Sequence, residues 1–257
     1  MRLHIAWILE PIARKLSFAR AMNGVQLLLR AQGIGAGATV ATSGEQRVFN
    51  FISSDEPILF DVGGHVGEYS RAFLDRFPKG GAFLFEPSGA HMQRARQNLP
   101  KGVQFYQVAL SDTDKIATLY KDEEISGLAS LTKRRLDHID IRMDMTEEIR
   151  CRTLDSVVEE ANIGHIDLLK IDVEGHELDV LRGAMKTLER GQIDLVQFEF
   201  GGCNLDTRTT LKDYFYFFQS LGYTLHLIRP FGDPVALPEY GEVYEQYRTT
   251  NYLAMRV

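Results

Sequence analysis

Apolar residues in this chain fall into short continuous runs, separated by longer segments in which they recur every three or four positions. Short continuous runs are typical of strands that are buried on both faces of a sheet. The runs are ILFDV (58–62), GAFLFE (81–86), VQFYQVAL (103–110), IDLLKIDV (166–173) and IDLVQFEF (193–200). We therefore predict five buried strands over these ranges.

The intervening segments carry apolar residues at helical spacing. In the segment 176–190, one stripe is formed by Leu178, Leu181, Met185 and Leu188. Further helices are predicted over 88–99 and 211–222, and two closing strands over 223–228 and 250–257. Buried strands that alternate with helices predict a doubly wound α/β fold, with helices on both faces of a mostly parallel sheet.

Two stretches do not follow this alternation. Residues 1–54 are helix-prone and then glycine-rich, which predicts an N-terminal helical cap on a main domain over 55–257. The first apolar run is interrupted by Glu10 and Pro11 and is too short to span a membrane, so it predicts an amphipathic helix for packing, dimerisation or a membrane-edge contact. The charged segment 111–165 lies between the third and fourth strands, where an insertion would shape a substrate pocket.

Composition narrows the classes of partner. A net charge of -6 and a pI near 5.7 argue against a nucleic-acid partner, because such proteins carry a basic face. Cys151 and Cys203 are too few for a disulfide framework, so we expect a reducing, cytoplasmic setting. A homodimer is compatible with the apolar N-terminal segment.

Acidic residues follow the predicted strands, at the edge of a parallel sheet where ligands bind. After the first strand, Asp61 leads into a loop that contains Gly63, Gly64, Gly67 and Ser70. The next four strands end at Glu86, Asp112, Asp172 and Glu199. Because these ends meet at one edge, we predict that the acids surround a common ligand.

The loop after the first strand does not fit a nicotinamide cofactor. His65 and Glu68 stand where a G-x-G-x-x-G pattern requires glycine. Asp61 and Glu68, on either side of the glycines, would repel a phosphate. S-adenosylmethionine has no phosphate and carries positive charge, so it suits this loop. Glu86 would accept from the ribose hydroxyls and Asp112 from the adenine amine.

The sequence IDVEGHE, after the fourth strand, carries the predicted catalytic residues. O-methyl transfer needs a hydroxyl held in line and a group that accepts its proton. We expect His176 or Asp172 to be the general base and Glu174 to orient the base or the substrate, with Asp172 also bordering the cofactor. An alternative has Asp172, Glu174 and Glu199 bind Mg²⁺, which would lower the pKa of the hydroxyl.

Residues beyond the fifth strand suggest the acceptor. Glu199 and Asn204 offer hydrogen bonds to a polyhydroxyl substrate such as a sugar. Tyr244, with Tyr240 and Tyr247, falls at helical spacing and would either stack on a sugar ring or simply pack. Two other functions stay open: an NAD-dependent oxidoreductase, disfavoured by the loop, and a non-catalytic S-adenosylmethionine-binding module.

Several of these motifs resemble one family. ILFDVGGHVGEYS, FLFEPS, VALSD, RTLDSVV and IDLLKIDVEGHELDVLRGA are similar to the FkbM family of S-adenosylmethionine-dependent methyltransferases. The resemblance implies a class I methyltransferase sheet with an antiparallel last strand, and O-methylation of a sugar in a glycan or glycosylated metabolite. It also implies that Asp61, Gly63, Gly67, Glu86 and Asp112 hold the cofactor. The family more usually has asparagine at the position of His65.

Overall fold

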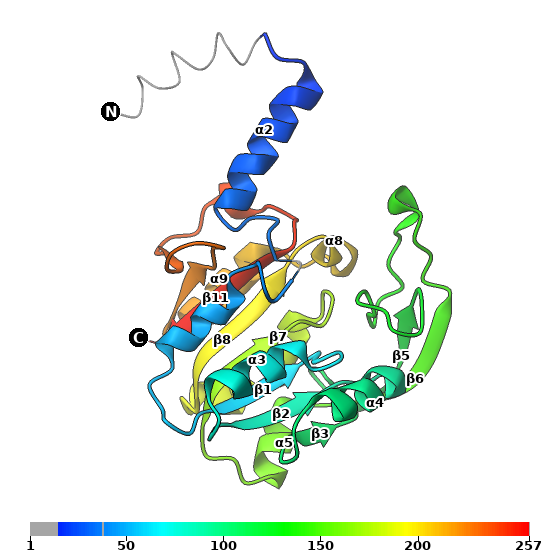
Figure 1. Cartoon of the computed structure of the whole chain (residues 1–257), viewed down its shortest axis with the longest axis vertical. Coiled ribbons are helices and arrows are strands. Elements are labelled where there is room, and N and C mark those ends of the chain that lie inside the picture. Colours follow the sequence, from blue (N-terminus) through cyan, green and yellow to red (C-terminus); the bar gives the residue numbers. More distant parts are fainter. Residues whose placement is uncertain (1–14, 38, 257) are drawn as a thin grey trace.

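The apolar runs form the central sheet of the protein. The computed structural model describes residues 15–37 and 39–256. Its main sheet has eight strands in the order β10-β9-β11-β8-β7-β1-β2-β3 (Figure 1). These strands are β1 (Ile58–Val62), β2 (Gly81–Phe85), β3 (Gln104–Tyr106), β7 (Ile166–Ile171), β8 (Ile193–Phe200), β9 (Tyr223–Leu227), β10 (Val235–Leu237) and β11 (Thr250–Arg256).

Strand directions confirm the predicted fold class. β1 pairs in parallel with β2 and β7, and β7 pairs in parallel with β8. β11, the last strand, lies between β8 and β9 and is antiparallel to both. All six residues of β7 are buried, as a strand covered on both faces requires. The sheet is mostly parallel and has the antiparallel last strand that the family resemblance implied.

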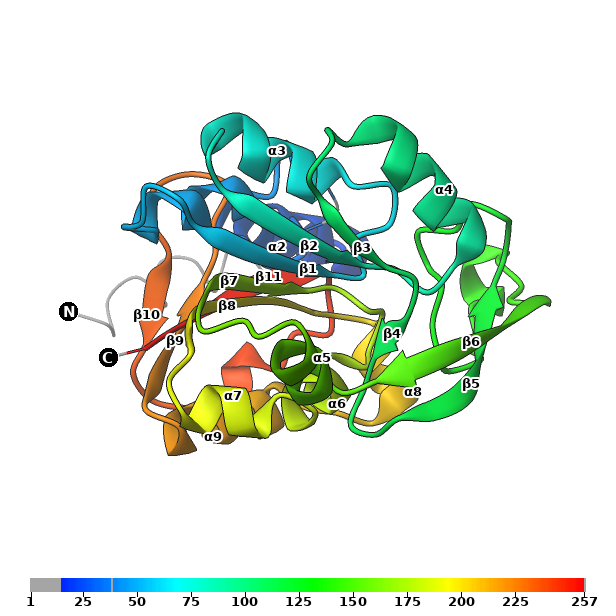
Figure 2. The ribbon, with the colours of Figure 1, turned by 90° about the horizontal axis from the view of Figure 1, so that it is seen from below.

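Helices cover both faces of the sheet (Figure 2). On one face lie α3 (Glu68–Arg76) and α4 (Gly89–Asn98). On the other lie α5 (Leu154–Glu160), α6 (Glu177–Arg182), α7 (Met185–Glu189) and α9 (Leu211–Ser220), and α8 (Cys203–Thr207) follows β8. The larger core cluster packs Leu178, Leu181, Tyr214 and Phe218 against the sheet, and a second cluster holds Phe49, Tyr69 and Phe73. The apolar stripes predicted for these helices are therefore the faces that they bury.

The predicted strand over 103–110 is wrong as a single element. β3 ends at Tyr106, whose carbonyl accepts from Val108 N–H at 2.9 Å in a tight turn. The chain then enters a different sheet as β4 (Ala109–Leu110). An apolar run does not show such a turn, and the β3 half lies at the edge of the sheet, where its residues are exposed or half-buried.

The predicted helix over 176–190 is also divided. α6 ends at Arg182 and α7 begins at Met185. A Cβ on Gly183 would lie 2.0 Å from the carbonyl oxygen of Ser111. The helix breaks where its backbone meets this neighbouring segment, while the apolar stripe continues across the break.

The segment 111–165 is partly an insertion and partly core. β5 (Lys115–Lys121) and β6 (Met145–Arg152) form a three-stranded sheet with β4, and a short 3₁₀ helix, η2 (Asp137–Ile139), lies in their connection. This arm stands beside the main sheet (Figure 1). α5, by contrast, buries Leu154 and Val157 in the main core.

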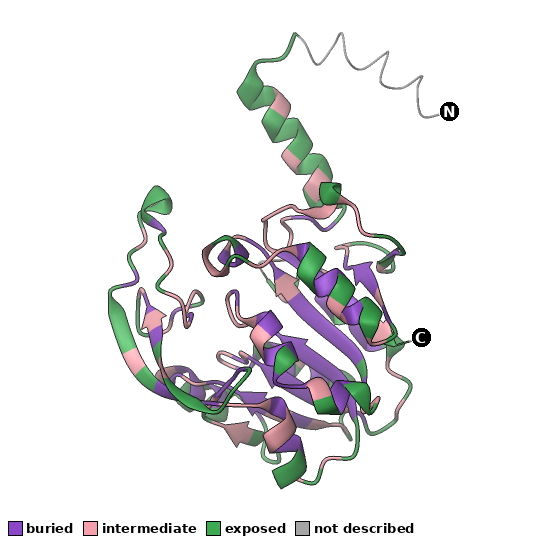
Figure 3. Cartoon of the chain, turned by 180° about the vertical axis from the view of Figure 1, so that it is seen from behind, coloured by how far each residue is buried: buried purple, intermediate pink, exposed green. Residues whose placement is uncertain are grey.

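The N-terminal region contains a projecting helix and a packed turn. α2 (Phe18–Ala31) has no buried residue and extends away from the sheet (Figures 1 and 3). The 3₁₀ helix η1 (Glu45–Phe51) buries Val48 and Phe49. Residues 1–14, predicted to begin the cap, lie outside the described residues. Among the helices described, none has the length and apolar character needed to cross a membrane.

Candidate active site

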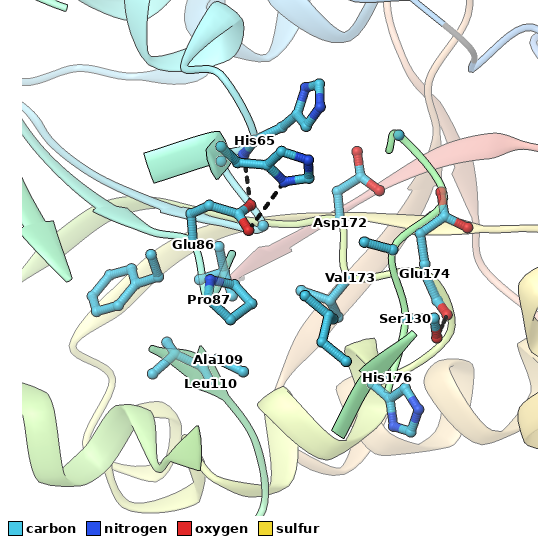
Figure 4. Close-up of a pocket in the computed structure, with 18 of the residues that line it drawn as sticks. His65, Glu86, Pro87, Ala109, Leu110, Ser130, Asp172, Val173, Glu174 and His176 are labelled. Carbon is cyan, nitrogen blue, oxygen red and sulfur yellow. Dashed lines mark hydrogen bonds and ion pairs between the residues drawn. The ribbon is translucent and has the colours of Figure 1, made fainter. Parts of the chain in front are cut away.

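A cavity of about 350 Å³ opens at the carboxyl ends of β1, β2 and β7 (Figure 4). Its size falls within the range of small-molecule sites. Polar groups in its wall include His65, Glu86, Asp172, Glu174 and His176. Apolar surface comes from Val62, Phe85, Pro87, Val108, Leu110 and Leu119. Residues at the ends of β1, β2, β4 and β7 therefore share one cavity, although Asp61, Asp112 and Glu199 are not part of its wall.

The glycines of the first loop serve close packing. The amides of Gly63 and Gly64 both donate to the carbonyl of Phe85, at 2.9 and 3.1 Å. A Cβ on Gly63 (φ +74°) would lie 1.8 Å from the carbonyl oxygen of Asp172. The loop is thus pressed between two strands, and these two amides are already engaged rather than free to receive a phosphate.

The carboxylate of Glu86 is fixed by hydrogen bonds with neighbouring residues. It is 5% exposed and accepts from His65 N–H at 3.0 Å and Ser88 N–H at 2.8 Å, and it contacts His91 Nδ1 at 3.3 Å (Figure 4). The His65 ring lies edge-on to that of His91, with 4.4 Å between centroids. Burial, then the neighbouring His91, lowers the pKa of His65. The Nε2 atoms of both rings are buried without a hydrogen-bond partner and border the cavity.

A buried cation, Lys170, lies under the loop. Its Nζ is 3.6 Å from Asp61 and 3.3 Å from Asp172, and the charges of these acids raise its pKa against the opposing effect of burial. Asp61 also accepts from Ser70 at 2.6 Å and does not line the cavity. Asp61 and Ser70 therefore lie behind the loop, beside Lys170, and neither is part of the cavity wall.

A second buried acid, Glu45, adjoins this network. It accepts from Ser43 Oγ at 2.9 Å and from Gln197 Nε2 at 2.9 Å, while Tyr69 donates to Gln197 at 2.6 Å. Burial raises the pKa of Glu45 to about 7, although Lys170 opposes the rise. Sequence reasoning missed Glu45 and Lys170. The lysine inside the apolar run LLKID was the one sequence signal of a buried ion pair.

The connection between β5 and β6 runs along the IDVEGHE loop. Ser130 Oγ donates to the Glu174 carbonyl at 2.8 Å, Thr132 Oγ1 lies 2.9 Å from His176 Nε2, and Arg134 pairs with the Glu174 carboxylate. These three residues alternate, as side chains on one side of an extended segment do. We call Ser130–Arg134 the strap. The sequence pattern of the charged segment 111–165 did not indicate the roles of Thr132 and Arg134.

Three acids converge beside the strap. Asp172, Glu174 and Glu199 offer carboxylate oxygens within 4.8 Å of one another. Burial, then the Asp172 charge, raises the pKa of both Glu174 and Glu199, and Arg134 opposes the rise at Glu174. The three acids predicted to bind Mg²⁺ therefore lie together. Positive charge already reaches them, because Lys170 pairs with Asp172 and Arg134 pairs with Glu174.

His176 is held between two partners. Its Nδ1 lies 2.9 Å from Asp179 Oδ2, and its Nε2 faces Thr132. The hydrogen bond with His176 lowers the pKa of Asp179. Glu177, which is fully buried, accepts from the amides of Val173 and Gly175 at 3.1 and 3.0 Å. Glu177 therefore shapes the loop, and His176 and Asp179 form a dyad at the cavity wall.

A family model for the methyltransferase FkbM domain matches residues 61–225, which is more than half of the chain. The chain belongs to this family. 2-O-methyltransferase NoeI of Sinorhizobium fredii is 28% identical over 156 residues, covering 56% of this chain and 64% of NoeI. Hexuronic acid methyltransferase AglP of Haloferax volcanii is 26% identical over 164 residues, covering 62% of this chain and 64% of AglP. The matched region covers less than two-thirds of the length of each of these relatives.

Among solved structures, methyltransferase FkbM of Methylobacillus flagellatus aligns with 77% of this chain and 44% of its own, at 14% identity and a TM-score of 0.47.

Besides Asp61, Ser70 and Glu199, four more residues that were predicted for the site of this FkbM chain lie outside the cavity wall. Asp112 pairs with Lys115 at 3.0 Å and is not part of the cavity wall. Asn204 is fully buried and binds Gly201, Thr209 and Tyr214 within its own region. Tyr244 ends the 3₁₀ helix η3 (Glu242–Tyr244) and packs against the main core. Gly67 begins α3 beside Leu99 and does not border the cavity.

Proposed function

We propose that this chain transfers a methyl group from S-adenosylmethionine to a hydroxyl of a sugar, in a glycan or a glycosylated metabolite. The observation that carries the proposal is the cavity wall, where Glu86 at the end of β2 and Asp172 and Glu174 at the end of β7 share one cavity with His176 of the His176–Asp179 dyad. Membership of the FkbM family supports methyl transfer. Two relatives, named as a 2-O-methyltransferase and a hexuronic acid methyltransferase, support a sugar acceptor.

The cavity fits this cofactor on its own chemistry. Glu86 faces the cavity at the end of β2, where a carboxylate accepts from ribose hydroxyls. The unpartnered Nε2 atoms of His65 and His91 would gain partners from a polar ligand. Asp172 would lie near the cationic end, and apolar surface from Phe85 and Leu110 suits a flat base. When bound, S-adenosylmethionine supplies a methyl group already activated on its sulfonium.

The remaining task of the protein is to accept a proton. His176 Nδ1–H donates to Asp179, which leaves Nε2 free of its proton and able to accept one. Thr132 occupies the hydrogen-bond position at Nε2, so an acceptor hydroxyl would replace it or bind beside it. Asp179 then stabilises the imidazolium that forms. His176 is thus the proposed base, with Glu174 bordering the acceptor and Arg134 holding Glu174 in place.

Separate measurements of binding and turnover test the proposal. Calorimetric titration is expected to show binding of S-adenosylmethionine but not of NAD. Labelled methyl transfer to a panel of sugar nucleotides and glycosides then identifies the acceptor. His176→Asn should lower kcat by about 10²- to 10⁴-fold and leave cofactor affinity unchanged, whereas Glu86→Gln should weaken cofactor binding.

His138→Asn is the matched control, because His138 is an exposed histidine of η2. It should leave both quantities unchanged. Full turnover in both His176→Asn and Asp172→Asn would contradict the assignment, and cofactor binding without transfer to any acceptor would favour a binding module. Activity that a strong chelator abolishes and Mg²⁺ restores would replace the metal-free mechanism with a metal-assisted one.

A further inference from the structure

α2 presents an apolar stripe that nothing in the described structure covers. Phe18, Met22 and Val25 recur at spacings of four and three, so they lie on one side of the helix. Their side chains are exposed, Phe18 to 82%. The helix stands clear of the sheet, and its surface is mostly exposed along its length (Figures 1 and 3). Only Leu29, near its end, is packed against the core.

The charge of this region differs from that of the whole chain. Between residues 11 and 44 the sequence has no aspartate or glutamate, whereas the whole chain has a net charge of -6. Arg20 lies on the side of α2 opposite the stripe, a side that also carries the exposed Leu27, and Arg30 lies between that side and the stripe. The exposed Lys15 precedes the helix. A helix with an apolar side and a cationic side is the form that lies in the surface of an anionic bilayer.

A second copy of the chain fits this surface less well. A helix of 14 residues is about 21 Å long, so a stripe about 10 Å wide offers roughly 200 Å² for each partner. Stable interfaces bury about 800 Å² for each partner. The stripe alone is therefore too small for a stable dimer, whereas interfacial binding needs only a few apolar side chains together with cationic attraction.

We propose that α2 docks the protein on anionic phospholipid bilayers, with Phe18, Met22 and Val25 entering the interface and the arginines facing the headgroups. This inference does not depend on the proposed catalytic function. The acidic body is held away from the surface, because α2 projects from it (Figure 1).

Co-sedimentation of the full chain with vesicles tests the proposal. The chain should bind vesicles that contain phosphatidylglycerol, should bind pure phosphatidylcholine far less, and should dissociate as salt is raised. Replacing both Arg20 and Arg30 by Gln should weaken binding at least tenfold, since each cation near the surface contributes about fivefold.

Matched variants test the orientation of the helix. Met22→Gln with Val25→Gln should weaken binding at least tenfold, whereas Leu27→Gln should change it less than twofold. Leu27 is 72% exposed but lies on the side opposite Val25. Circular dichroism confirms that each variant stays folded. Three results would each overturn the proposal. The first is equal vesicle binding by these variants, and the second is no preference for anionic vesicles. The third is a chain that does not bind vesicles but self-associates, and loses this self-association when the stripe is substituted.

Discussion

Arg134 joins the strap to the rest of the site, and its removal gives a sharp test of the described geometry. Its side chain is 8% exposed; Nη1 donates to Glu174 and Nε donates to Asp206 at 3.2 Å. Arg134→Met keeps most of the apolar volume and leaves two carboxylates without their cation. Breaking a buried ion pair by removing one partner costs about 3–5 kcal/mol. Because Asp206 is partly exposed and the pKa of Glu174 is raised to about 8, so that its carboxyl is only partly ionised at pH 8, we expect a loss of about 1–3 kcal/mol in the free energy of unfolding at that pH.

The loss of stability caused by Arg134→Met should become smaller as pH falls. Burial already raises the pKa of Glu174, and Arg134 opposes that rise. Without Arg134, the pKa of Glu174 rises further, so the cost of ionising it is relieved as pH falls and the carboxyl takes up a proton. Urea unfolding at pH 8 and pH 5.5 measures both values. The variant should therefore be closer to wild type at the lower pH.

Arg135→Met is the control for this experiment. Arg135 is the next residue along the chain, but its side chain is 87% exposed and its partner Asp137 is 64% exposed. An exposed pair of this kind contributes little, so no measurable change is expected. Equal effects of the two substitutions, or a larger loss for Arg134→Met at pH 5.5, would refute the reasoning.

Three further predictions follow from single contacts. Burial raises the pKa of Glu45 from 4.5 to about 7, so Glu45 should lower the wild-type free energy of unfolding by roughly 3 kcal/mol as pH rises through that window. In pH-dependent urea unfolding, Glu45→Gln should reduce the fall by about this amount, while Glu174 and Glu199, whose pKa values are also raised, still contribute to it. Gly63→Ala would place a Cβ 1.8 Å from a backbone oxygen and should strongly lower the Tm, whereas Gly164→Ala, with open space around it, should leave it nearly unchanged. Asp179→Asn should lower kcat of methyl transfer about 10²-fold or more without changing cofactor affinity in titrations, and an unchanged kcat would remove Asp179 from the dyad.

The local pattern of the sequence predicted most of the fold. Continuous apolar runs marked the strands because a strand covered by helices on both faces has no polar side. The same runs placed Glu86, Asp172 and Glu199 at the sheet edge, since the end of a parallel strand is also its ligand-binding end. The division of 103–110 and of 176–190 was hidden, because a short turn leaves the pattern of apolar residues unchanged.

The tertiary structure decided which of these side chains meet. Arg134 pairs with Glu174 across 40 positions, and Gln197 binds Glu45 across 152 positions, and neither pair has a local signal. Asp112 follows a strand end but pairs with Lys115, three residues along the chain, and is not part of the cavity wall. Local periodicity sets where elements begin and end, because it reflects which side of each element is buried. Contacts between side chains depend on how those elements pack, which this sequence determines only through the complete fold.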